Sequence, residues 1–171
     1  GFAVTALDNS ARRMGRLMAN LERTQLNAER VTADVMDWEP SAPYDAILLD
    51  APCSATGTMR RHPDVLQRID IKAINNLAAI QSAMLDRVAD WVKPGGVLVF
   101  ATCSLEAVEG EAQAEAFLAR QPEYTTSPAT ADELPAGITP NAQGHVRTMP
   151  PMLAEQGGLD GFFVARFVRA G

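Results

Sequence analysis

The sequence is poor in the features that mark secreted and membrane proteins. It has only two cysteines among 171 residues, too few for a disulfide framework, so reduced thiols, either buried or reactive, are expected. No apolar run approaches the roughly 20 residues that a membrane-spanning helix needs, and no basic and apolar leader opens the chain. These absences favour a cytoplasmic protein without a membrane partner.

Positive charge is also scarce. The chain has 15 Lys and Arg against 21 Asp and Glu, which gives a formal net charge of -6. A domain that grips a polyanion through bulk electrostatics needs clustered basic residues, so any contact with nucleic acid must be local. The stretch from Arg60 to His62 is one candidate patch. A second, with Arg12, Arg13 and Arg16, is better explained as the solvated face of a helix.

The composition, with 47% hydrophobic and 21% charged residues, is that of an ordinary globular protein, and the length suits a single domain over residues 1–171. Strands and helices are expected to alternate. The patterns predict strands at 2–8, 29–35, 44–50, 97–101 and 161–168, an edge strand near Tyr124, and helices at 10–23, 71–92 and 106–120. This order predicts an α/β fold whose sheet is mostly parallel, with helices on both faces and a last strand able to run antiparallel.

Several local features can be predicted within these elements. Ser10 is expected to cap the first helix, and the run Lys93-Pro94-Gly95-Gly96 to end the second, because proline and glycine do not continue a helix. The unbroken apolar run 97–100 indicates a strand buried on both faces. In the third helix, the residues expected to point inward are Ala112, Ala116 and Phe117.

Reactive side chains follow two of the apolar strands. Strand 44–50 ends in Asp50 and leads into Ala51-Pro52-Cys53, while strand 97–101 leads into Thr102-Cys103-Ser104. In an open α/β sheet, ligands sit beyond the carboxyl ends of the strands. The two cysteines are therefore expected at the same edge of the sheet, where they would form a chemical site.

Two less specific interpretations compete for these cysteines. Buried Cys commonly packs as a small hydrophobic residue, but polar neighbours in both motifs argue against that role. A zinc site would use Cys53, Cys103, His62 and His145, yet the chain has no Cys-x-x-Cys motif and no short Cys/His spacing. No metal is therefore expected.

Acidic and basic residues near the strand ends have alternative roles as well. Asp8 and Asp34 end the first two strands, where one carboxylate can accept both hydroxyls of a ribose and another an exocyclic amine. The commoner role of such residues is to form a turn or a helix cap. Arg60 and Arg61 suit phosphate or a splayed base, or else ion pairs with Asp64 or Asp70.

The motifs together resemble those of the RNA (cytosine-5) methyltransferases of the bacterial Sun family. The resemblance runs over residues 2–168 and rests on four stretches: Asp-Ala-Pro-Cys-Ser-Ala-Thr-Gly at 50–57, Arg-Arg-His-Pro-Asp at 60–64, Ala-Thr-Cys-Ser-Leu at 101–105 and Leu-Asp-Gly-Phe-Phe at 159–163. It implies a Rossmann-like methyltransferase fold, S-adenosylmethionine as cofactor, and a cytosine in RNA as substrate, with ribosomal RNA favoured over transfer RNA. A catalytically silent RNA-binding or assembly module with the same fold is the alternative.

The resemblance also implies roles for individual residues. Carbon 5 of cytosine becomes nucleophilic only after a thiolate adds to carbon 6, and motif matching gives that addition to Cys103. Cys53 assists release of the product, and Asp50 lies beside the methyl donor and the base. Asp8, Asp34 and Asp50 are the expected cofactor contacts, whereas Arg60, Arg61 and His62 are the expected contacts with RNA.

One part of the family pattern is not found in the sequence. Family members carry a glycine-rich loop after their first strand, ahead of the acid that Asp8 matches, and this chain begins after that loop. We therefore expect the later part of a catalytic domain, without the first strand, and weak binding of S-adenosylmethionine by the 171-residue chain alone.

Overall fold

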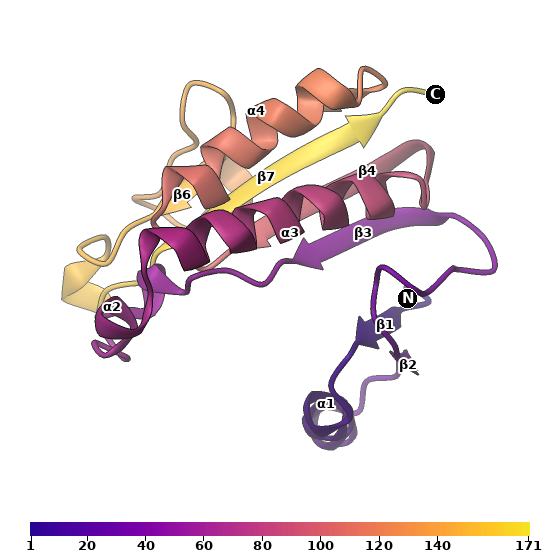
Figure 1. The fold of residues 1–171 in the computed structure, drawn as a ribbon, viewed down its shortest axis with the longest axis horizontal. Helices are drawn as coiled ribbons and strands as arrows, with labels where there is room; N and C mark the ends of the chain where they lie inside the picture. Colours follow the sequence, from indigo (N-terminus) through magenta and orange to yellow (C-terminus); the bar gives the residue numbers. More distant parts are fainter. The chain divides into compact units, whose positions relative to one another are not determined.

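The computed structural model describes residues 1–171, which divide into two compact units, residues 1–41 and residues 42–171. Figure 1 shows the helices and strands of both. Each unit is described by itself, and the expected single domain over residues 1–171 stays a prediction.

The first unit is a strand, a helix and a strand, as the sequence predicts. Strands β1 (Thr5–Asp8) and β2 (Glu29–Thr32) pair in parallel, and α1 (Ala11–Thr24) connects them. The predicted cap is confirmed, since the Ser10 side chain accepts a hydrogen bond from the Arg13 backbone at 3.3 Å. The second strand is shorter than predicted. Asp34 lies in the following turn, where its carboxylate accepts the Met36 backbone N–H at 2.9 Å.

The second unit is built on a mixed five-stranded sheet. Its order is β3 (Tyr44–Asp50), β4 (Val92–Thr102), β7 (Phe162–Arg169) and β5 (Tyr124–Thr126), and β6 (Val146–Thr148) also pairs with β7. Strands β3 and β4 are parallel, whereas β7 is antiparallel to β4, β5 and β6. The antiparallel last strand and the edge strand near Tyr124 are thus confirmed; the sequence did not predict β6.

Helices α3 (Ile71–Ala89) and α4 (Glu111–Arg120) pack against each other, and α3 also contacts β3 and β4. A short helix, α2 (Val65–Arg68), precedes α3. The core lies under these helices. Its fully buried side chains include Leu85, Leu98, Phe100, Phe117, Phe163 and Phe167.

The predicted end of the second long helix was wrong. Helix α3 stops at Ala89, and Val92 already pairs with Tyr44 as the first residue of β4. The Pro-Gly-Gly run therefore lies within an irregular start of the strand, where Gly95 takes a φ of 76° and a Cβ on Gly96 would lie 2.9 Å from the Asp45 carbonyl oxygen. Glycine thus serves a bulge in the strand pairing here, not a helix end.

The burial of β4 and α4 also differs from the prediction. Leu98 and Phe100 in β4 are fully buried, but Val97 and Val99 are only half-buried, so one face is packed more tightly than the other. In α4, the inward side carries Gln113, Ala114 and Phe117, whereas Ala112 and Ala116 are not buried. A 3-10 turn, Ala107–Glu109, precedes this helix, which starts at Glu111 and not at residue 106.

Candidate active site

The two cysteines lie together at the carboxyl ends of β3 and β4. These strands are parallel neighbours, with Asp50 paired to Ala101, so the segments that follow them leave the sheet at the same edge. The sulfur atoms of Cys53 and Cys103 are 3.3 Å apart, and both side chains are half-buried. The structure thus brings together the two thiols that the sequence predicts to share a site.

The close contact makes the two thiols chemically unequal. The hydrogen bond from the Cys53 thiol lowers the pKa of Cys103 to about 7. The same bond, together with burial, raises the pKa of Cys53. Near neutral pH the pair therefore holds a thiolate on Cys103 and a proton on Cys53.

We predict that this difference appears in alkylation kinetics. The rate at which iodoacetamide modifies Cys103 should rise with pH through a midpoint near 7, because the thiolate is the reactive form, while Cys53 should stay slow over the same range. Mass spectrometry of the separate peptides measures both rates, and the urea-unfolded protein is the control. Equal midpoints for the two cysteines, near the value of about 8.5 for a free thiol, would contradict the assignment.

Asp50 is the last residue of β3. Its side chain is exposed by surface area, yet surrounding chain crowds the carboxyl group enough that partial loss of solvation raises its pKa. Its negative charge also acts on Cys103 and opposes the lowering of that thiol's pKa. A carboxyl group and a thiolate therefore influence each other at the strand ends.

A buried carboxylate that the sequence analysis missed holds the segments after both cysteines. Glu109 is fully buried. It accepts hydrogen bonds from the Ser54 hydroxyl at 2.5 Å, the Ser104 hydroxyl at 2.6 Å, and the Ser54 backbone N–H and the Gln81 amide at 3.0 Å each. The repeated Cys-Ser pair was the signal available in the sequence. Because each serine follows a cysteine, one carboxylate fixes the backbone beside both thiols.

Removal of this charge should destabilise the protein. In the variant Glu109→Gln, the new side-chain amide has N–H donors of its own, and these face groups that already donate to this position. A buried polar group left without a partner costs about 1 to 3 kcal/mol. We expect the free energy of unfolding, measured by urea denaturation, to fall by that amount. Glu115→Gln, at an exposed position of α4, is the matched control and should change it by less than about 0.5 kcal/mol. Equal effects of the two substitutions would show that the Glu109 charge is unimportant.

Gly57 ties the two cysteine segments to the start of β7. Its N–H donates to the Cys103 carbonyl at 3.0 Å, and its own carbonyl accepts the Gly161 N–H at 2.8 Å. A Cβ at position 57 would lie 2.0 Å from the Gly161 oxygen, so the close approach needs glycine. Two of the motifs that carry the family resemblance, those around residues 57 and 161, are therefore in direct contact.

Arg147 on β6 is a second residue that the sequence analysis missed. Its guanidinium donates to the Ser104 carbonyl at 2.7 Å and forms an ion pair with Glu111, with a contact of 2.5 Å. It also lies over the Phe163 ring, 5.0 Å from the centroid. The backbone after Cys103 is thus held from the β7 side as well.

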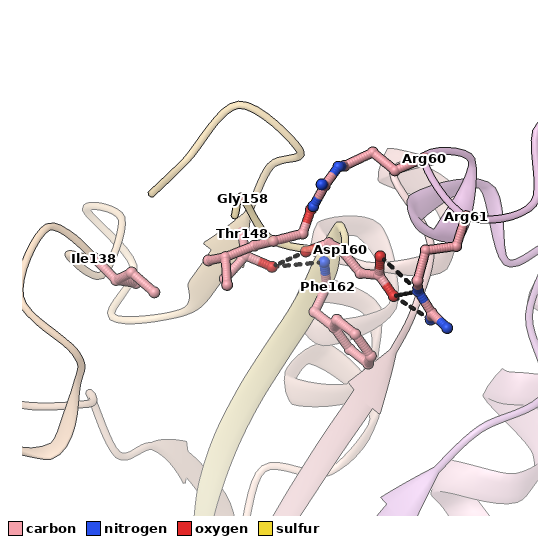
Figure 2. Close-up of a pocket in the computed structure, with 8 residues that line it drawn as sticks. Arg60, Arg61, Ile138, Thr148, Gly158, Asp160 and Phe162 are labelled. Atoms are coloured by element: carbon pink, nitrogen blue, oxygen red, sulfur yellow. Dashed lines mark hydrogen bonds and ion pairs between the residues drawn. The ribbon is translucent and has the colours of Figure 1, made fainter. Parts of the chain in front are cut away.

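The basic residues after the first cysteine line a cavity of about 510 Å³, shown in Figure 2. Arg60 donates to the Gly157 carbonyl at 2.6 Å, and Arg61 forms an ion pair with Asp160, with Nε and a carboxylate oxygen 2.9 Å apart. The Arg61 guanidinium holds the pKa of Asp160 below its usual range. The arginines therefore order the 157–160 segment next to the cysteine site.

The predicted alternative partners of these arginines were wrong. Asp64 pairs with Arg68, and Asp70 caps α3 by accepting the Ala73 N–H at 2.7 Å. Arg61 keeps a side chain that is 60% exposed despite its ion pair, and His62 is exposed as well. Contact of Arg60, Arg61 and His62 with RNA stays a prediction.

No group of three or more His, Cys, Asp or Glu side chains is arranged to hold a metal ion. His145, considered above as a zinc ligand, packs edge-on against Phe163 with ring centroids 5.4 Å apart, and burial lowers its pKa.

No helix has the length and apolar character needed to cross a membrane.

In the first unit, the two predicted cofactor residues lie at or just beyond the ends of parallel neighbouring strands. Asp8 ends β1, and its carboxylate accepts the Ser10 N–H at 2.7 Å and the Arg13 guanidinium at 2.8 Å. The bond from Arg13 lowers the pKa of Asp8. Asp34 follows β2. Both therefore also act as turn or cap residues.

The strands and helices described above have the Rossmann-like fold of the S-adenosylmethionine-dependent methyltransferases, as predicted. NSun6 from Pyrococcus horikoshii, solved with SFG, matches 99% of this chain and 42% of its own, with a TM-score of 0.80 and 26% identity. A methyltransferase homologue from the same organism matches 98% of this chain and 53% of its own, with a TM-score of 0.75 and 26% identity.

The sequence of this chain also matches a known protein family. Residues 2–168 match the model of the family described as 16S rRNA methyltransferase RsmB/F, and the chain belongs to this family, which confirms the resemblance seen in the cysteine motifs. Ribosomal RNA small subunit methyltransferase B is 42% identical in both Pseudomonas syringae pv. tomato and Xylella fastidiosa, over 97% and 98% of this chain. The chain spans 37% and 38% of those relatives.

Proposed function

We propose that the protein transfers a methyl group from S-adenosylmethionine to carbon 5 of a cytosine in ribosomal RNA, through a covalent bond between Cys103 and carbon 6. The observation that carries this proposal is the pair of thiols 3.3 Å apart at the carboxyl ends of two parallel strands. Membership of a family described by rRNA methylation supports the substrate, and such a substrate is consistent with a cytoplasmic location.

The first step is assigned to Cys103. Its lowered pKa makes a thiolate available near neutral pH, and addition of that thiolate to carbon 6 gives carbon 5 the electron density it otherwise lacks. Asp50, the last residue of β3, is assigned the contact with the base beside the methyl donor. Partial loss of solvation raises its pKa, and a carboxyl group that has taken up a proton can donate a hydrogen bond to N3 of the ring as negative charge develops there.

The last step is assigned to Cys53. After methyl transfer, a base must remove the proton on carbon 5, so that the double bond re-forms and the electron pair of the carbon–sulfur bond returns to Cys103. Contact with Cys103 is the first cause of the raised pKa of Cys53. Once Cys103 is bonded to carbon it carries no negative charge, so Cys53 ionises more easily at the stage that needs a base.

The residues present suit the proposed cofactor. The carboxylates of Asp8 and Asp34 follow adjacent parallel strands, β1 and β2, where Asp8 can accept ribose hydroxyls and Asp34 an exocyclic amine of the adenine. S-adenosylmethionine, when bound, supplies an electrophilic methyl group. Asp8 is held in place by Ser10 and Arg13, so it is oriented before the ligand arrives.

Local contacts with RNA are assigned to Arg60, Arg61 and His62. The cavity beside them, which Phe162 and Thr148 also line, combines guanidinium groups with an aromatic side chain, as sites for an unstacked base do. With a net charge of -6, this chain has little bulk attraction for RNA, so these few side chains would have to supply it.

The proposal is tested with RNA in which the target cytosine is 5-fluorocytosine. A fluorine on carbon 5 cannot leave as a proton does, so the full-length protein, given S-adenosylmethionine, should form a covalent adduct that survives denaturation. Unmodified RNA is the control and should be methylated without a stable adduct. Binding of 16S rRNA with no adduct and no methyl transfer would favour a catalytically silent RNA-binding module, and methylation of transfer RNA alone would refute the ribosomal substrate.

A further inference from the structure

We propose that Cys53 and Cys103 are also a redox-sensitive pair, which peroxide converts into a disulfide that a thiol reductant reopens. Formation of the disulfide rests on the placement of the two thiols alone. The accompanying loss of methyl transfer rests on the proposed function, in which both sulfur atoms react with the substrate.

The distance between the sulfur atoms favours this bond. They are 3.3 Å apart, and a disulfide of about 2.05 Å therefore requires an approach of only about 1.3 Å. The 171 residues contain no other cysteine, so each thiol has one possible partner within this chain.

The surroundings hold the thiols at this spacing while leaving them accessible. Ser54 and Ser104, the residues after the cysteines, both bind the buried Glu109 carboxylate, so the two segments keep their positions relative to each other. Both cysteine side chains are only half-buried, and a molecule as small as hydrogen peroxide can reach them.

The chemistry balances with peroxide as the oxidant. The Cys103 thiolate attacks one peroxide oxygen, the O–O bond breaks, and hydroxide leaves and takes up a proton to become water. Cys103 is now a sulfenic acid. The Cys53 sulfur then attacks the Cys103 sulfur, the S–O bond breaks, and a second water leaves with the Cys53 proton. Two thiols lose two electrons in total, and one peroxide gains them.

The asymmetry of the pair fits this order of events. Cys103 has the lower pKa and is the thiol that reacts first, while its neighbour resolves the sulfenic acid before further oxidation to the irreversible sulfinic acid. In a reducing compartment such a disulfide is transient. Oxidation would therefore pause the enzyme instead of destroying it.

The experiment treats the full-length protein with hydrogen peroxide, blocks the remaining thiols, and maps disulfides by mass spectrometry without reduction. We expect a peptide pair joined through Cys53 and Cys103, loss of methyl transfer in proportion to that pair, and recovery of both with dithiothreitol. In the matched variant Cys53→Ser, the same treatment should instead drive Cys103 to sulfinic acid, which dithiothreitol does not reverse.

Three results decide the matter. Sulfinic acid on Cys103 of the unsubstituted protein, with Cys53 still free, would overturn the proposal. A disulfide that joins Cys103 to a second molecule, with no internal pair, would overturn it as well. An internal Cys53–Cys103 disulfide in a protein that does not methylate RNA even when reduced would support the redox pair and contradict the proposed function.

Discussion

Replacement of Cys103 by alanine is expected to abolish methyl transfer and to prevent any covalent adduct with 5-fluorocytosine RNA. The only other cysteine in the sequence is Cys53, which the proposed mechanism assigns to the proton on carbon 5, so no second thiol is assigned to add to carbon 6. Loss of a covalent nucleophile lowers turnover by a factor of at least about 10⁴. The measurement is transfer of a labelled methyl group to 16S rRNA by the full-length protein, beside gel analysis of the adduct.

The control for this substitution is Thr125→Ala, at an exposed position of the edge strand β5, which should methylate at the unsubstituted rate. RNA affinity should be retained in the Cys103 variant, because no charge that contacts phosphate is removed. Methylation at the normal rate by the Cys103→Ala variant would exclude this residue as the nucleophile.

Replacement of Cys53 by alanine is expected to have the opposite signature. Addition of Cys103 to the cytosine still proceeds. The variant lacks the thiol that lies 3.3 Å from the nucleophile, so no group accepts the proton on carbon 5. The adduct therefore accumulates on ordinary RNA. Removal of a general base lowers turnover by about 10² to 10⁴. The expected observation is a protein–RNA band that resists denaturation and forms only when S-adenosylmethionine is present.

The double substitution Cys53→Ala with Cys103→Ala distinguishes this trapping from unspecific crosslinking. It should give no band, because the nucleophile is absent. A band that persisted in the double variant would point to another crosslinking group. Trapping by Cys103→Ala, with none by Cys53→Ala, would reverse the two roles.

Most of the strands and the cysteine pair could be predicted because their signals are local. Strand β3 matches its predicted bounds, 44–50, and ends in the predicted carboxylate. The parallel neighbours β3 and β4 then bring the two cysteine segments to one edge, as expected from topology. Apolar runs, strand ends and reactive residues that follow them can all be recognised in consecutive letters.

The supports of the site could not be predicted because they join residues far apart in the chain. Glu109 binds Ser54 across 55 positions, and Arg61 pairs with Asp160 across 99. Neither acid stands out locally, since Glu109 is one of four glutamates between positions 106 and 115, and a surface aspartate would look the same in the sequence as Asp160. The start of β4 was missed for a different reason: Pro-Gly-Gly ends helices more often than it forms a bulge at the start of a strand.

The anchoring of both cysteine segments on one buried carboxylate also bears on how the site moves. Loops that carry reactive groups commonly open and close independently of the core. Here the Ser54 N–H and the hydroxyl groups of Ser54 and Ser104 all donate hydrogen bonds to Glu109. Gln81 of α3 donates to the same carboxylate. Separation of the sulfur atoms would therefore require partial opening of the core. In the proposed reaction the thiol pair would therefore stay fixed while a base enters and leaves, and the nucleotide would have to change its conformation to meet it.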